Sequence, residues 1–243
     1  MNRYLQVATT LALLLLGHQS LAQMVEEVIV TGVRASDTEL PGVVYKRTAD
    51  FLLLEIRVIN DSRNEDTRKT EIIKTLKSAI SLVKKKADIQ LSIVKDGFVL
   101  PLNTVDSTFD ITSGQRPDTS EVTIRVKTGI TDASENPAEL LNRLNTFADS
   151  VPVEGRTELV PYGKAELSVV NPSQYRPDII ELVAADVKKT TSAMGAEYRV
   201  LMSGLDAPVQ WVRSGPISLA MYIPYSYEII PDNINAYFST GEY

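Results

Sequence analysis

The sequence contains no cysteine, and its single histidine, His18, lies within the first 22 residues. Beyond residue 22, therefore, Ser-His-Asp and Cys-His nucleophilic sites, histidine acid–base chemistry, thiol redox chemistry and ordinary zinc sites each lack a required group. Disulfide bonds are excluded as well, so a buried core must stabilise the fold, and a chain of 243 residues can supply one. Carboxylates, lysine, tyrosine and serine remain. We expect no enzymatic activity, no catalytic residues and no cofactor.

The sequence also lacks an apolar run long enough for a membrane-spanning helix, which needs roughly 20 residues. The run Val7–Leu16 is about half that length, follows Arg3 and precedes a small-x-small ending, which is the pattern of a secretory signal. We predict a signal peptide over residues 1–22, cleaved between Ala22 and Gln23. The alternative is an uncleaved anchor. Cleavage would leave no transmembrane anchor and would place the protein in the periplasm of a Gram-negative envelope.

Positive charge is in deficit, with 25 Lys and Arg against 31 Asp and Glu and a net charge of −6. An acidic chain of mixed charge is poorly suited to nucleic acid or anionic lipid, so we expect neither as a partner. The one cationic cluster, Lys84-Lys85-Lys86, follows a predicted helix, where positive charge complements the helix dipole. We interpret these lysines as a solvated helix end rather than as a binding patch.

Alternating apolar and polar residues predict several β-strands. Two hairpins are also expected, one around Asp96-Gly97 within 87–103 and one around a turn at Pro161–Gly163 within 156–170. The single strands are expected at about 25–33, 49–60, 121–128, 197–205 and 217–230.

Apolar residues at helical spacing predict three amphipathic helices, at 64–86, 136–151 and 175–194, the last ended by Gly195. The expected apolar stripes are Ile73, Leu76, Ile80 and Val83; Leu140, Leu141, Leu144, Phe147 and Ala148; and Ile180, Val183, Ala184, Val187 and Met194. These elements predict an α+β fold, mainly antiparallel, with about three helices packed on one face. It would form a single domain over 23–230, followed by a polar tail over 231–243.

Three short motifs carry a resemblance to a known family: "VIVTG" at 28–32, "LVAADVKKTTSAMG" at 182–195 and "YSYEII" at 225–230. Together they resemble the SIMPL domain family of exported bacterial proteins that are periplasmic or associated with the outer membrane. The resemblance implies an envelope protein without catalytic residues, which in some members assembles into rings or is linked to stress tolerance.

The stretch "EEVIVTG" also looks like the start of TonB-dependent receptors. A receptor barrel needs many strands of about ten residues, for which this chain has no room. Whether residues 25–32 contact TonB stays open.

Few residues stand out as candidates for chemistry. Glu26 and Glu27 alternate across a strand, so we expect them to face solvent rather than to form a catalytic pair. No spaced D-x-D-x-D-G loop is present, and we expect no metal site. Tyr225 and Tyr227 share a strand face, and with Trp211 they form a hypothetical interface; the alternative is aromatic packing beneath a helix in a monomer.

We therefore expect a cell-envelope protein that acts through protein–protein contact. Its partner would be a copy of itself or another envelope protein. The alternative is a periplasmic module that binds a small ligand in a pocket between sheet and helices.

Overall fold

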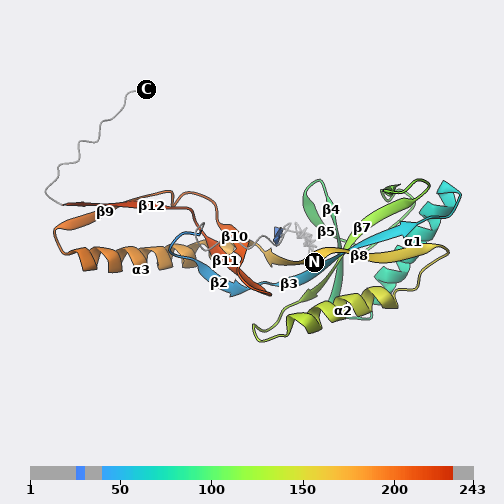
Figure 1. Cartoon of the computed structure of the whole chain (residues 1–243), viewed down its shortest axis with the longest axis horizontal. Helices are drawn as coiled ribbons and strands as arrows, with labels where there is room; N and C mark the ends of the chain where they lie inside the picture. Colours follow the sequence, from blue (N-terminus) through green and yellow to red (C-terminus); the bar gives the residue numbers. More distant parts are fainter. Residues whose placement is uncertain (1–25, 31–39, 232–243) are drawn as a thin grey trace, which may run out of the picture.

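The computed structural model describes residues 26–30 and 40–231. The predicted leader, its cleavage point at Ala22–Gln23 and residues 232–243 of the predicted tail lie outside the described residues. Within the described part, the helices combine with three antiparallel sheets, which confirms the α+β class. The molecule is elongated, with the largest sheet at one end and a helix with a two-stranded sheet at the other (Figure 1).

The main sheet has seven strands in the order β1-β8-β3-β7-β4-β5, and β6 pairs with β7 off this path. Although β1 and β5 stand at opposite ends of this order, they contact each other, so the sheet curls nearly into a barrel. The strands are β1 (Glu27–Val30), β3 (Phe51–Asn60), β4 (Ile89–Lys95), β5 (Phe98–Pro101), β6 (Thr112–Ser113), β7 (Ser120–Gly129) and β8 (Thr157–Val170).

Helix α1 (Glu65–Val83) begins where the Asn64 side chain accepts a hydrogen bond from the Thr67 amide at 3.0 Å. Its buried face is displaced from the expected stripe, because Ile72 is fully buried whereas Ile73 is only partly buried. The side chains of Leu76 and Ile80 are buried as predicted. The lysines at 84–86 follow the helix, with Lys84 as its C-cap.

Helix α2 (Pro137–Ser150) starts as the sequence predicts, with the Asn136 side chain accepting from the Ala138 amide at 3.0 Å. It buries the predicted apolar residues Leu140, Leu144, Phe147 and Ala148, while Leu141 is partly buried. Both α1 and α2 pack on the main sheet. We call the main sheet with these two helices the body.

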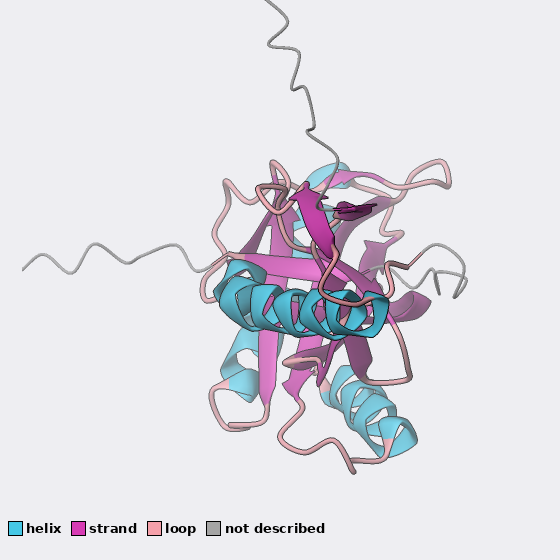
Figure 2. Ribbon diagram, turned by 90° about the vertical axis from the view of Figure 1, so that its left-hand side faces the viewer, coloured by secondary structure: helices cyan, strands magenta, loops and turns pink. Residues whose placement is uncertain are grey.

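Helix α3 (Arg176–Met194) follows a 3-10 turn, η1 (Pro172–Tyr175), and ends at Gly195, whose φ is 100°. It packs against β9 (Tyr198–Ser203), which pairs only with β12 (Ser226–Pro231) among the described strands. We call α3, β9 and β12 the arm; Figure 2, seen from the arm end, shows α3 in front of the body.

The expectation that all three helices share one sheet face is therefore wrong for α3. Of its predicted stripe, Val183 is buried as expected, but Ala184 and Met194 are exposed. The other buried residue of the helix, Ile179, was not part of that stripe.

A third sheet, the middle sheet, joins the arm to the body. It has the order β10-β11-β2, and its short strands are β2 (Tyr45–Thr48), β10 (Gln210–Arg213) and β11 (Ser218–Tyr222). The Arg213 Nη1 donates to the carbonyl oxygen of Ala165 in β8 at 2.8 Å, and the Ala49 amide donates to the Ile217 carbonyl at 2.9 Å. The first bond joins β10 to the main sheet, whereas the second continues the pairing of β2 with β11 by one residue.

Two expected strand boundaries were wrong. The single strand expected at 217–230 is two strands, because the chain leaves the sheet at Ile223–Tyr225, where Pro224 has no amide to donate. Conversely, the expected turn at Pro161–Gly163 lies inside the continuous strand β8. There the register with β3 shifts between Leu53 and Glu55, and Gly163 has a φ of 73°. The hairpin around Asp96-Gly97 is confirmed, with positive φ at both residues.

Candidate binding sites: a seam cavity and an apolar arm

One face of the main sheet carries charged side chains at alternating positions. In β3, Leu54, Ile56 and Val58 are buried on the face that α1 and α2 cover. Glu55 alternates with them and pairs in register with Arg125 of β7, which in turn pairs with Ser92 of β4. Since side chains alternate along a strand, these three residues share the opposite face.

Lys127 of β7 forms one ion pair on this face. Its Nζ lies 2.5 Å from Glu27 Oε2 and 4.3 Å from the centroid of the Phe51 ring. The second carboxylate oxygen of Glu27 accepts from the Ser168 hydroxyl at 2.8 Å. The Lys127 and Glu27 side chains are only 9% and 11% exposed. Glu26 is exposed as expected, but the expectation of a solvent-facing Glu27 was wrong, because β1 pairs with β8 above this cluster.

Arg125 stands between two carboxylates. Its Nη2 donates to Glu55 Oε2 at 3.2 Å, and its Nε lies 3.6 Å from Glu166 Oε2. That Nε and that oxygen are buried without a hydrogen-bond partner, as is the hydroxyl of Ser92. Burial raises the pKa of Glu166, and the nearby Glu55 carboxylate raises it further, against the opposing effect of Arg125. The cluster therefore contains three polar atoms that can still accept or donate a hydrogen bond.

A cavity of about 1150 Å³ opens beside this cluster, where the two ends of the curled sheet meet. We call it the seam cavity. Residues of β1, of the β4–β5 hairpin and of the C-terminal end of α1 line it, and its walls are mostly apolar. The polar side chains at its surface include Ser92, Arg125 and Lys127.

The sequence alone did not predict the charged cluster or the seam cavity. Charged residues alternate with apolar ones in the sequences of β3 and β7, and this pattern predicts strands with one apolar face but no pairing between the charges. The missing signal was the pairing of opposite charges between strands that are far apart in the chain.

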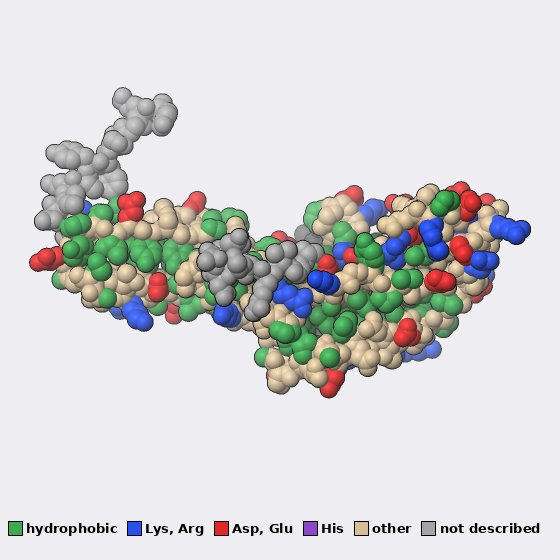
Figure 3. Space-filling model, viewed as in Figure 1, with side chains coloured by type: hydrophobic (Ala, Val, Ile, Leu, Met, Phe, Trp, Pro, Cys, Tyr) green, Lys and Arg blue, Asp and Glu red, His purple; other side chains and the backbone are tan. Residues whose placement is uncertain are grey.

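The arm presents a second candidate site, made of exposed apolar residues. Figure 3 shows hydrophobic side chains gathered along the arm. The exposed large apolar residues of the arm are Leu182 and Met194 in α3, Leu201 in β9 and Tyr227 in β12. In the described part of the chain, no strand pairs with the outer edge of β9 or of β12.

The predicted aromatic residues are divided between two sheets. The rings of Tyr225 and Tyr227 stack with their centroids 6.3 Å apart and an angle of 17° between planes. Tyr225 lies just before β12 and is partly buried against the core, which raises the pKa of its hydroxyl. Trp211 lies in β10 of the middle sheet, opposite Met221, and is also partly buried. Of the three, Tyr227 is the exposed residue.

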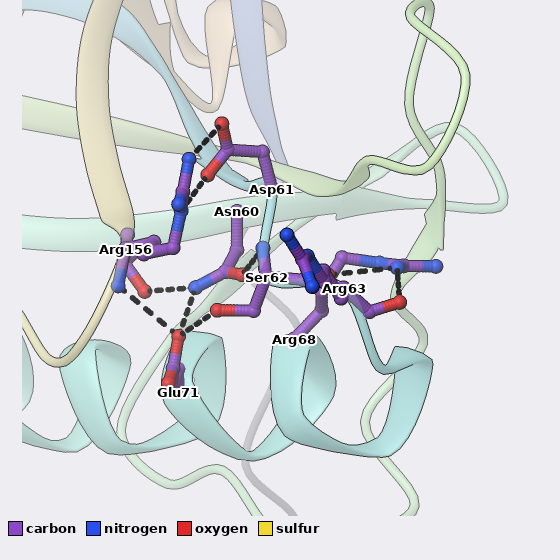
Figure 4. Close-up of polar contacts among 8 residues, drawn as sticks. Asn60, Asp61, Ser62, Arg63, Arg68, Glu71 and Arg156 are labelled. Carbon is purple, nitrogen blue, oxygen red and sulfur yellow. Dashed lines mark hydrogen bonds and ion pairs between the residues drawn. The ribbon is translucent and has the colours of Figure 1, made fainter.

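A polar network at the start of α1 is a third cluster, but its hydrogen bonds are already made (Figure 4). The Glu71 carboxylate accepts from the Asn60 side chain at 2.7 Å, the Ser62 hydroxyl at 2.8 Å and the Arg156 amide at 3.1 Å. These bonds, that of Asn60 first, lower the pKa of Glu71. Arg156 also forms a two-point ion pair with Asp61 at 2.7 and 2.9 Å. We interpret this network as structural, joining α1 to β3 and β8.

The described part of the chain has neither a metal site nor a membrane-spanning helix, and comparisons with known proteins show no relative. Among residues 26–30 and 40–231, no group of three or more His, Cys, Asp or Glu side chains could hold a metal ion. Helices in this part of the chain are too short or too polar to cross a membrane. No protein-family model, curated protein or solved structure matches the chain.

Proposed function

We propose that this protein is an exported protein of the cell envelope that acts by contact with other proteins, and that it assembles with copies of itself through the arm. The arm carries this proposal. Its helix α3 has 19 residues, yet only Ile179 and Val183 among them are buried. Catalysis is not part of the proposal, since the sequence beyond residue 22 has no His and no Cys.

The arm leaves both apolar surface and backbone hydrogen-bonding groups open. A two-stranded sheet is marginally stable in water unless something packs on it, and a single helix covers this one. Among residues 26–30 and 40–231, no strand pairs with the outer edge of β9 or of β12, and such a strand edge is a template for pairing with another strand. Leu201 of β9 and Tyr227 of β12 are exposed beside these edges.

A second copy of the chain suits this surface better than an unrelated partner. Strands β9 and β12 have six residues each. An antiparallel edge can pair with the same edge of a second copy about a twofold axis, so both copies gain the same contacts. Assembly of this kind also agrees with the resemblance to the SIMPL domain family, and the envelope location agrees with the predicted leader.

Light scattering on the purified protein, coupled to size exclusion, tests the proposal. We expect a mass of more than one chain, and a lower mass for the double variant Leu201→Ser/Tyr227→Ser. Val153→Ser is the matched control, because Val153 is exposed in the loop after α2, away from the arm. A strict monomer at all concentrations, together with no envelope partner in a crosslinking pull-down, would overturn the proposal.

A further inference from the structure

The seam cavity has the size and composition of a site for a small amphiphilic molecule. Small-molecule sites in proteins measure about 300–1,000 Å³, are mostly apolar and hold a few placed polar groups. The seam cavity, at about 1150 Å³, is slightly larger than the upper end of this range. It is therefore large enough for an unbranched apolar chain.

The apolar wall of the cavity comes mainly from the β4–β5 hairpin. Val94, Val99 and Leu100 line it on that side, and Ile29 and Phe51 line it on the side of β1 and β3. Val94 is exposed although it is apolar, and so is the neighbouring Phe98. Exposed apolar surface around a cavity marks a place where an apolar ligand would remove that surface from water.

The polar end of the cavity has hydrogen-bond donors without acceptors. Ser92 is 1% exposed, and its hydroxyl has no hydrogen-bond partner. Arg125, its partner in register, has a buried Nε that makes no hydrogen bond, although the Glu166 carboxylate lies 3.6 Å from it. Leaving a buried polar group unpaired costs free energy, so a ligand atom that satisfies both donors would be favoured. That atom must be an acceptor, because the guanidinium can only donate.

The other charged side chains of the site determine which charge the head group of a ligand can carry. Lys127 is paired with Glu27, and Arg125 is shared between Glu55 and Glu166. Two exposed side chains of opposite charge, Lys84 and Glu26, also line the cavity, so the site has no excess of positive charge that would demand an anion. The requirement is an oxygen acceptor of either charge state.

An ammonium head group offers no acceptor to the Ser92 hydroxyl or the Arg125 Nε and would meet the guanidinium as a like charge. The Glu166 oxygen that lacks a hydrogen bond could accept from an ammonium, but Glu166 is not among the residues that line the cavity.

We propose that the seam cavity binds a single-chain amphiphile, with its apolar chain along the β4–β5 hairpin and an acceptor oxygen of its head group at the Ser92 hydroxyl and the Arg125 Nε. This site is separate from the arm and does not rest on assembly. The ligand class comprises single-chain fatty acids and their neutral esters, which share this chemistry.

Displacement of the neutral apolar dye N-phenyl-1-naphthylamine tests the proposal on the whole protein. We expect saturable dye binding, displaced by laurate or by monolaurin below their micellar concentrations but not by dodecylamine. Laurate and monolaurin also distinguish an anionic from a neutral ligand. Val94→Trp should weaken dye binding by occupying part of the cavity, whereas Val153→Trp, which adds the same ring outside it, should not.

Ser92→Ala tests where the head group lies. We expect dye binding to be unchanged, but displacement by laurate and monolaurin to need about three- to tenfold more competitor, since one hydrogen bond is lost. The fold should not suffer, because the deleted hydroxyl has no partner, and an unchanged unfolding temperature checks this.

Three results would overturn this inference. They are the absence of saturable dye binding, dye binding that Val94→Trp leaves intact, and displacement by dodecylamine as effective as that by monolaurin. An unchanged displacement curve for Ser92→Ala would refute the placement of the head group. Since Val94 lies outside the arm, Val94→Trp should keep the oligomer mass of the parent, so failure of this inference is distinguishable from failure of the proposed assembly.

Discussion

Helices α1 and α3 have the same length, 19 residues each, but they are packed very differently. In the body, α1 lies on a seven-stranded sheet and buries six side chains, including Ile72, Leu76 and Ile80. In the arm, α3 lies against a two-stranded sheet and buries two. An amphipathic pattern shows that a helix has an apolar face, but it does not show how much partner surface the chain itself provides.

The strands show the same contrast. In the body, β3 pairs over its whole length with β7 and over most of it with β8, so its backbone groups are used on both sides. In the arm, β9 and β12 pair with each other, and their outer edges are open in the described part of the chain. The body is therefore built as a folded unit, whereas the arm is built as a surface for contact.

The sharpest test of this contrast is removal of an apolar side chain from each region. Phe147→Ala in α2 deletes a ring that is 1% exposed, and we expect a loss of about 3–5 kcal/mol in the free energy of unfolding. Leu182→Ala in α3 deletes an exposed side chain and should cost less than about 0.5 kcal/mol. Urea denaturation measures both, and similar losses would contradict the difference between body and arm.

A smaller loss is expected from the polar network of the body. Glu71→Ala would leave the Asn60 amide and the Ser62 hydroxyl without their acceptor, at a cost of about 1–3 kcal/mol in the free energy of unfolding. The control is Glu154→Ala, which removes an exposed ion pair with Lys74 worth about 0–1 kcal/mol. Equal effects of the two variants in urea denaturation would mean that the network is not structural.

Acid should weaken the same network. The hydrogen bonds to Glu71 lower its pKa in the folded state below the ordinary value of 4.5. Its contribution to stability is thus fully present above that value and is lost as the pH falls through the lower folded pKa. Unfolding temperatures measured from pH 7 to pH 3 should fall less steeply for Glu71→Gln than for the parent. Parallel curves would show that Glu71 is not a source of the acid sensitivity.

The smallest loss of free energy of unfolding is expected from a substitution in the arm. There the main effect should be on association between copies of the chain. Leu201→Ser should change the free energy of unfolding by less than about 0.5 kcal/mol, because the side chain is exposed. If copies associate through the arm, the parent's unfolding temperature rises with protein concentration, and Leu201→Ser reduces this rise. A parent whose unfolding temperature is independent of concentration would contradict the prediction.

Local signals predicted the elements that have clear beginnings and ends. Two of the helices begin within one residue of their expected starts, where Asn64 and Asn136 act as N-caps, and Asp96-Gly97 forms the expected hairpin turn. The expected turn at Pro161–Gly163 does not form, because β3 pairs with β8 on both sides of it. The irregularity there is a shift in the register of the two strands. Strands β2 and β10 were missed because four residues are too few to show alternation.

The candidate sites were harder to predict than the elements. The seam cavity depends on Ser92 of β4 lying beside Arg125 of β7, and on Glu55 and Glu166 reaching the same guanidinium from β3 and β8. Pattern analysis assigns each of these residues to a face of its own strand, but it does not supply strand order or register. The stacking of Tyr225 on Tyr227 could be predicted from the sequence, because residues two apart in a strand lie on the same face.

Disulfide crosslinking tests the central claim, that the arm pairs with a second copy, most directly. Since the chain has no native cysteine, a single Leu201→Cys near the middle of β9 provides the one reactive thiol. A twofold axis that pairs β9 with its own copy brings residues at the middle of the strand closest to their copies, within reach of a disulfide. Under mild oxidation we expect a covalent dimer from Leu201→Cys and none from the control, Val153→Cys, at the same protein concentration. Equal yields from both variants, or no dimer from Leu201→Cys, would contradict the account.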